Sequence, residues 1–239
     1  MAKIHVLLKK EELDNQRLTG KVVVVLDILF ATSSIVAAMA HGAAEVIPTL
    51  DGKAALAASQ GRKADSYVLS GELNADTLPG FVHPTPLALL AANLAGKTLI
   101  YSTTNGTVAV KKSHGADHVY AAALLNGKAV VEHIAHRHGD ETVLIACSGS
   151  ADNFNLEDFY GAGYLVSLFA QHSGAHEFSD AALAASMLHE KCDAADCLRR
   201  ARVGRMMLAR RLDREIDFAA QKSLYSVVPK FEDGRLRAA

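Results

Sequence analysis

The chain has 239 residues, of which 50% are hydrophobic and 21% are charged, a composition that argues against extended disorder. The formal net charge of −1 argues against nucleic-acid binding as the main task. No apolar run approaches the roughly 20 residues that cross a bilayer, the first residues lack a signal-peptide pattern, and three cysteines offer no disulfide framework. We therefore expect a cytoplasmic protein without membrane partners.

Apolar, strand-like stretches alternate with alanine-rich, helix-like stretches along the chain. The strands predicted from this pattern cover residues 4–8, 22–26, 45–48, 66–69, 98–101, 118–121, 142–147 and 225–228. The predicted helices cover residues 31–40, 86–94, 130–138, 156–171 and 181–191. Because strands that alternate with helices pair in parallel, we expect a three-layer α/β fold: a largely parallel sheet with helices on both faces, and a helical C-terminal segment. No linker or repeat marks an internal boundary, so residues 1–239 are predicted to form a single domain.

Asp27 stands directly after a predicted strand of β-branched, apolar residues. A small-residue helix that carries Thr32 and Ser33 near its start follows. In open α/β sheets, ligands bind beyond the carboxyl ends of the strands, where helix N-termini offer free N–H groups to anions. An acid beside hydroxyl groups therefore predicts a site for a hard cation together with an anionic ligand. The alternative is that Asp27 only caps the helix or pairs with a surface base.

Two further predicted strands end on similar polar residues. Glu72 follows the strand that ends in Leu-Ser-Gly, and a hydroxyl-rich turn follows the strand at 98–101. Such a turn presents hydroxyl and N–H groups to an oxyanion, although an ordinary Asn-Gly turn with a helix cap is the alternative. The candidate substrate-binding residues of this turn are Thr103, Thr104, Asn105, Gly106 and Thr107. Several strand ends of this kind favour one convergent site over separate caps.

The segment after the strand at 142–147 supplies further candidates. Ser148 and Gly149 follow the strand end directly and are predicted to contact the substrate. Asn155 is predicted to cap the next helix, so that Glu157 and Asp158 fall in the first turn, where the helix dipole favours acids. Capping alone accounts for these two acids, and a role as metal ligands is the second interpretation.

Together these segments resemble the 2-phosphosulfolactate phosphatase family, a class of Mg²⁺-dependent phosphatases. The shared segments keep their order across nearly the whole chain, and Thr-Thr-Asn-Gly-Thr at 103–107 is the most specific of them. In chain order they are 24–29 with 31–32, 71–72, 80–81, 103–107, 156–158 with 162–163, 216–218 and 227–229. The resemblance implies hydrolysis of a small anionic phosphate ester, with Asp27 and Glu72 as catalytic residues.

The resemblance also implies Mg²⁺ as the cofactor. Mg²⁺ is usually held by one or two carboxylates and several waters. The candidate ligands are Asp27, Glu72, Glu157 and Asp158. Asp27 would serve either as a ligand or as a nucleophile. Because Leu29 stands two positions after it, an Asp-x-Asp nucleophile with an acid/base partner is disfavoured.

This sequence departs from the family pattern on the side that would bind the anion. Phe30 stands where the family usually has an arginine, and Val108 replaces a second one. A usual basic residue is missing at 152–154, and the usual Asn-Ser-Pro is altered at 83–86. An arginine guanidinium is a rigid fork for phosphate or sulfonate, which neither Phe nor Val replaces. Either the substrate differs from 2-phosphosulfolactate, or the site has decayed into a non-catalytic anion-binding protein.

Cys147 supplies a different enzyme hypothesis. Together with Asp27 and Lys97 it resembles the Asp/Lys/Cys set of isochorismatase-type hydrolases, in which a thiol at a helix N-terminus could act as nucleophile. The alternative is a small buried residue that closes a strand.

The C-terminal part of the chain is locally basic. Its arginines are Arg199, Arg200, Arg202, Arg205, Arg210, Arg211 and Arg214. Interleaved acids favour an exposed helix with salt bridges; the alternative is that one arginine enters the site and replaces the missing ones. Alanine-rich helices would also suit a homodimer interface, although an internal core accounts for them equally well.

Overall fold

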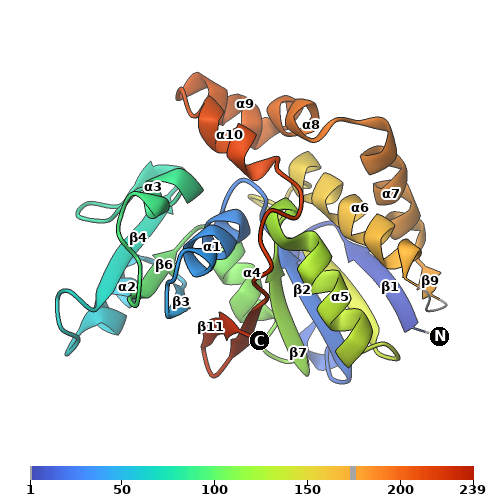
Figure 1. Cartoon of the computed structure of the whole chain (residues 1–239), viewed down its shortest axis with the longest axis horizontal. Coiled ribbons are helices and arrows are strands. Elements are labelled where there is room, and N and C mark those ends of the chain that lie inside the picture. Colours follow the sequence, from blue (N-terminus) through green and yellow to red (C-terminus); the bar gives the residue numbers. More distant parts are fainter. Residues whose placement is uncertain (1, 173–175) are drawn as a thin grey trace.

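The computed structural model describes residues 2–172 and 176–239 (Figure 1). The strands are β1 (Ala2–Leu7), β2 (Lys21–Leu26), β3 (Glu45–Thr49), β4 (Tyr67–Leu73), β5 (Asp76–Thr77), β6 (Thr98–Ser102), β7 (His118–Ala122), β8 (Thr142–Cys147), β9 (His176–Phe178), β10 (Pro229–Glu232) and β11 (Arg235–Ala238). The helices are α1 (Ala31–Ala40), α2 (Gly52–Ser59), α3 (Pro86–Leu90), α4 (Gly106–Lys112), α5 (Gly127–Arg137), α6 (Leu156–Gln171), α7 (Asp180–Lys191), α8 (Ala194–Arg200), α9 (Arg202–Ala209) and α10 (Asp213–Ala219). Short 3-10 turns are η1 (Lys10–Glu12), η2 (Asn15–Arg17) and η3 (Leu124–Asn126).

The described strands form one sheet with the order β5-β4-β6-β3-β11-β10-β7-β2-β8-β1-β9. It contains two parallel groups, β4-β6-β3 and β7-β2-β8-β1-β9. The antiparallel hairpin β10-β11 joins these groups through β7 and β3. Parallel neighbours need long crossover connections, which the helices supply. The predicted α/β fold with a largely parallel sheet is confirmed.

Strand β2 shows how the two faces of the sheet are covered. Its side chains are buried on both faces, which explains the continuous apolar run in the sequence. Val23 and Val25 belong to the apolar layer that contains Ile35 of α1, whereas Val24 and Leu26 belong to the layer that contains helices α5 and α6. Helices therefore cover both faces, which gives the predicted three layers.

The C-terminal segment is helical, as predicted. Helix α7 packs along α6, and α8, α9 and α10 gather at one end of the molecule, near α1 and α6 (Figure 1). Among the described residues, no helix is both long enough and apolar enough to cross a membrane.

The strand predicted at residues 225–228 is wrong. The backbone N–H of Tyr225 donates to the carbonyl of Leu125 (2.8 Å) in an irregular segment, and the strand begins at Pro229. In β10 and β11 few residues are fully buried, so these strands carry no apolar run to reveal them. Strands β5 and β9 were also not predicted, because a strand of two or three residues is too short to show the alternation of apolar and polar residues.

Candidate active site

Strand pairing brings the predicted polar residues together in two pairs. Strands β2 and β8 pair up to their last residues, so Asp27 and Ser148 are neighbours. Strands β4 and β6 pair up to the residues just before Glu72 and Thr103, so these two are also neighbours. Each pair follows from the rule that parallel strands end at the same edge of a sheet.

Gly106 joins the two pairs, because it allows α4 to approach α1 closely. A Cβ atom at Gly106 would lie 2.4 Å from the Cβ of Ala31 and 2.7 Å from Oδ2 of Asp27. No larger residue fits this contact without displacing the Asp27 carboxylate. The glycine of the Thr-Thr-Asn-Gly-Thr segment therefore sets the distance between the two strand ends.

A cleft of about 260 Å³ opens where the pairs meet. This volume lies just below the range of roughly 300–1,000 Å³ for small-molecule sites, so the cleft suits a small ligand. Five of the predicted site residues line it: Asp27, Glu72, Thr103, Thr104 and Asn105. The remaining lining residues are Leu29, Phe30, Asn74, Ala75, Ser150, Ala151, Asn155, Arg202, Val203 and Met206.

Asp27 is the most strongly perturbed acid of the cleft wall. Burial raises the pKa of its carboxyl group to about 6, and the negative charge of Glu72 adds to this effect. The N–H of Ala31 donates to Asp27 Oδ1 (3.2 Å), and the ammonium of Lys10 acts in the same direction to lower the pKa. Asp27 therefore caps α1, as the simpler interpretation predicted, and also faces the cleft.

Glu72, which also lines the cleft, accepts hydrogen bonds from three donors. Its Oε1 accepts hydrogen bonds from the backbone N–H (2.7 Å) and the hydroxyl (3.0 Å) of Thr104. Its Oε2 accepts a bond from the N–H of Ala75 (2.6 Å). These bonds tie the β4–β5 turn to the Thr-Thr-Asn-Gly-Thr segment and fix the direction of the carboxylate.

Several of the predicted substrate-binding residues serve the backbone instead of the cleft. Thr32 exchanges hydrogen bonds with the main chain of Asp27, and Ser33 donates to the carbonyl of Ile28 (2.8 Å). Thr107 donates to the carbonyl of Thr103 (2.8 Å) and closes the first turn of α4. None of these three hydroxyl-bearing residues lines the cleft.

Ser148 and Gly149 shape the floor behind the cleft without lining it. The Ser148 carbonyl accepts a hydrogen bond from the ammonium of Lys10 (3.3 Å). Gly149 adopts the left-handed conformation (φ +61°), and a Cβ there would lie 2.6 Å from the carbonyl oxygen of Asn153. Both residues hold the loop between β8 and α6 in place.

Asp158 is buried and bonded to the backbone on two sides. Its Oδ1 accepts from the N–H of Ile28 (2.8 Å), and its Oδ2 accepts from the N–H of Gly149 (3.2 Å). Burial raises the pKa of this carboxyl group well above its ordinary value. It therefore joins the loops after β2 and β8 and does not line the cleft.

Glu157 is buried beside the site without a hydrogen bond. Among the described residues, neither of its oxygens has a partner. Burial raises the pKa of Glu157 to about 7, with a further contribution from Asp27 and an opposing one from the guanidinium of Arg202. Within the described residues, no three of the four predicted metal ligands bring their oxygens within 4.8 Å of one another. A metal at this site would therefore have few carboxylate ligands.

The sequence matches the profile of 2-phosphosulpholactate phosphatases over residues 7–234. The chain belongs to the 2-phosphosulfolactate phosphatase family. It is 31% identical over 236 residues to a protein of Clostridium beijerinckii named probable 2-phosphosulfolactate phosphatase, with 98% of both chains covered. Proteins of the same name from Symbiobacterium thermophilum (34% identity, 92% of this chain and 95% of the relative) and Carboxydothermus hydrogenoformans (35%, 98% and 96%) are also similar.

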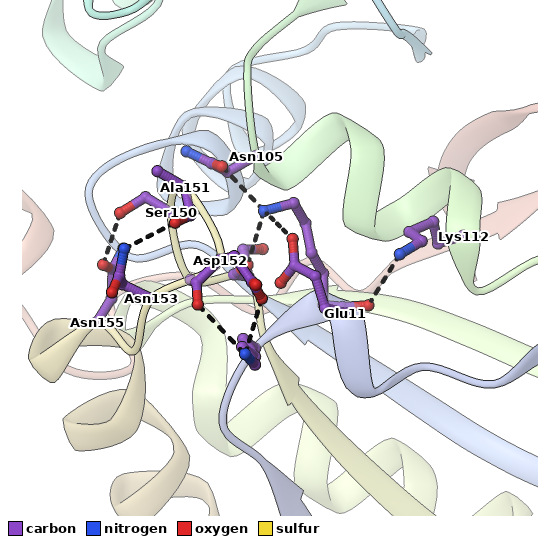
Figure 2. A network of polar contacts seen from close by, with 12 residues as sticks. Glu11, Asn105, Lys112, Ser150, Ala151, Asp152, Asn153 and Asn155 are labelled. Carbon is purple, nitrogen blue, oxygen red and sulfur yellow. Dashed lines mark hydrogen bonds and ion pairs between the residues drawn. The ribbon is translucent and has the colours of Figure 1, made fainter.

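In this member of the 2-phosphosulfolactate phosphatase family, two basic residues lie near the cleft. Lys10 was not predicted as a site residue, and Arg202 agrees with the alternative that one C-terminal arginine enters the site. Arg202 lines the cleft from the start of α9. Lys10 follows β1, whose end pairs with β8, and its ammonium donates to Asn105 Oδ1 (3.0 Å); Figure 2 shows Asn105 in this network. The strand-end rule that selected Asp27 and Glu72 could also have selected Lys10. Nothing local distinguishes Arg202 from the other arginines of the C-terminal segment.

Cys147 lies away from the cleft of this family member, fully buried at the end of β8. Burial raises the pKa of its thiol well above the ordinary value, whereas reactive cysteines are partly exposed and have lowered pKa values. Lys97 precedes β6 and does not line the cleft either. We expect Cys147→Ala to leave turnover unchanged, and iodoacetamide to leave the wild-type rate unchanged. Loss of activity in both experiments would support a thiol mechanism.

Proposed function

We propose that this protein is a Mg²⁺-dependent phosphatase that hydrolyses a small phosphate ester; its relatives are named probable 2-phosphosulfolactate phosphatases. The observation that carries the proposal is that Asp27 and Glu72 line one small cleft together with Thr103, Thr104 and Asn105. Two carboxylates beside hydroxyl and amide groups together suit a cation and a phosphate group.

The residues present fit a bound Mg²⁺. Burial and the negative charge of Glu72 both disfavour the ionised form of Asp27. A cation bound to both carboxylates would offset the desolvation of Asp27 and the repulsion between the two acids. Because the acids come together in pairs at most, they suit an ion that keeps several waters, as Mg²⁺ does. Asp27 and Glu72 would hold the ion, and Glu157, which lies behind the cleft, could join them only by moving.

The chain's own residues would orient the ester for hydrolysis. When bound, Mg²⁺ would polarise a phosphoryl oxygen. Asn105, whose amide oxygen is held by Lys10, is directed at the same cleft as Asp27. Above pH 6, Asp27 is largely ionised and can bind the cation or accept a proton.

We expect Mg²⁺-dependent release of inorganic phosphate from a panel of small phosphate esters that includes 2-phosphosulfolactate. The physical reason is that two like-charged carboxylates need a cation before an anionic ester can approach them. The measurement is phosphate release with Mg²⁺ and with excess chelator. No release from any ester under either condition would contradict the proposal and favour an anion-binding protein without catalysis.

A further inference from the structure

The positive charge in the cleft comes from Arg202 on α9, which is far in the sequence from the other residues of the site. Among the residues that line it, Arg202 alone is basic. Its guanidinium donates to the hydroxyl of Ser150, which itself donates to Asn155 Oδ1 (2.8 Å). Ser150 and Asn155 also line the cleft, and Figure 2 shows them on the loop that leads into α6. The hydrogen-bonding partner of Arg202 at the cleft is thus neutral, and the nearby acid that its charge acts on, Glu157, makes no hydrogen bond to it.

A second positive charge lies behind the cleft. The ammonium of Lys10 is buried and pairs with Glu11 (3.1 Å), besides its bond to Asn105 (Figure 2). A buried ammonium is costly unless it is paired, so Lys10 is committed to holding Asn105 and offsetting Asp27. Lys10 does not line the cleft itself. Arg202 therefore remains the cation that can contact a ligand directly.

The wall beside Arg202 is apolar. Leu29 and Phe30 line it from the start of α1, and Val203 and Met206 line it from α9. An anionic group placed against this wall would lose its hydration without gaining a hydrogen-bonding partner. Val108 does not line the cleft, so the sequence difference that matters there is Phe30.

We propose that Arg202 binds the phosphate group of the substrate, and that the wall formed by Leu29, Phe30, Val203 and Met206 takes an apolar organic group. The substrate class is then a phosphate monoester whose remaining part is uncharged and apolar, for example an aryl or alkyl ester. An ester with a sulfonate or carboxylate as well would need a second cation at the wall. This inference rests on the proposed function, whose site it completes.

The first test measures binding of inorganic phosphate in the presence of Mg²⁺ by isothermal titration calorimetry. Arg202→Gln is expected to weaken binding about 10- to 100-fold, because a charge-assisted hydrogen bond is lost, and Arg202→Lys should weaken it less. Arg205→Gln is the matched control: Arg205 is exposed on the same helix, does not line the cleft, and should bind phosphate as the wild type does. Equal affinity in Arg202→Gln and Arg205→Gln would overturn the assignment of Arg202.

The second test compares kcat/KM for butyl phosphate with kcat/KM for 2-phosphosulfolactate, because both esters release an alkoxide and so differ mainly in the group that meets the wall. The wild type should prefer the alkyl ester, and Phe30→Arg should shift the preference toward the more highly charged ester. Thermal unfolding of Phe30→Arg shows whether this variant is folded. If it is not, the substrate preference of the wild type alone tests the proposed substrate class. A wild-type preference for 2-phosphosulfolactate would overturn the substrate class.

The binding and turnover experiments separate the two proposals. If the wild type hydrolyses esters and Arg202→Gln leaves phosphate affinity and KM unchanged, the inference about Arg202 fails and the phosphatase proposal stands. If no ester is hydrolysed but Arg202→Gln still weakens phosphate binding, the phosphatase proposal fails and Arg202 is supported as an anion-binding residue.

Discussion

Asp27→Asn is expected to abolish phosphate release almost completely, with a loss in kcat of about 10²–10⁴-fold, the range for a residue that transfers a proton or charge at the reacting centre. The amide keeps an oxygen that can accept from the N–H of Ala31, so the start of α1 should keep its structure. The measurement is Mg²⁺-dependent phosphate release on the best ester of the panel. Asp152→Asn is the control, because Asp152 is exposed, pairs with Lys9 and does not line the cleft. Equal rates for both variants would remove Asp27 from the mechanism.

The pH dependence follows from the raised pKa of Asp27. At Mg²⁺ concentrations below saturation, the wild-type rate should rise as the pH increases through about 6, because a proton and Mg²⁺ compete for the Asp27 carboxylate. Stability should change in the opposite direction. Between about pH 4 and 6 the folded state binds a proton that the unfolded chain has lost, so stability falls as the pH rises and stays lower above pH 6.

Asp27→Asn removes this cost of a buried charge. At pH 8 it should therefore be more stable than the wild type by up to about 3 kcal/mol without metal, and the difference should vanish below pH 4. Added Mg²⁺ should raise the melting temperature of the wild type and leave that of Asp27→Asn unchanged. A wild-type melting temperature that does not respond to Mg²⁺ would contradict metal binding at Asp27, whatever the activity.

Asp158→Ala is expected to lower the free energy of unfolding by about 2–5 kcal/mol, because the buried N–H groups of Ile28 and Gly149 both lose their acceptor. In a chain of this size each kcal/mol lowers the melting temperature by about 2–4 °C. Asp158→Asn keeps one acceptor oxygen and should lose less. Urea-induced unfolding of the three proteins measures the differences.

Asp180→Ala is the matched control for Asp158→Ala. Asp180 also stands in the first turn of a helix, but it is exposed and serves the helix dipole alone. Its removal should cost about 0.3–1 kcal/mol. Equal losses for Asp158→Ala and Asp180→Ala would mean that Asp158 acts through the dipole and does not join the loops after β2 and β8.

Residues near one another in the sequence were largely predictable. The run of valines in β2 is buried on both faces, so its position and the helix after it follow from the apolar pattern. Asp27 and Thr103 were found because they follow β2 and β6, and strand ends are where parallel sheets bind ligands. Glu72 was predicted to follow its strand, but it lies inside β4, one residue beyond the part that pairs with β6. The roles of the acids were harder to predict: Glu157 and Asp158 are adjacent, yet one has no hydrogen-bonding partner among the described residues and the other bonds two backbone N–H groups.

By itself, the sequence determined the strands of five residues or more, five of the ten described helices and the polar residues at the strand ends, because these depend on short-range periodicity and backbone geometry. Only the tertiary structure decided which of those ends share a cleft, since that depends on the close packing of Gly106 against Ala31 and Asp27. The tertiary structure also placed Arg202 in the same cleft as Asp27, although the two residues lie far apart in the sequence. One exposed arginine resembles another until the packing of the C-terminal helices places its guanidinium, which no local pattern encodes.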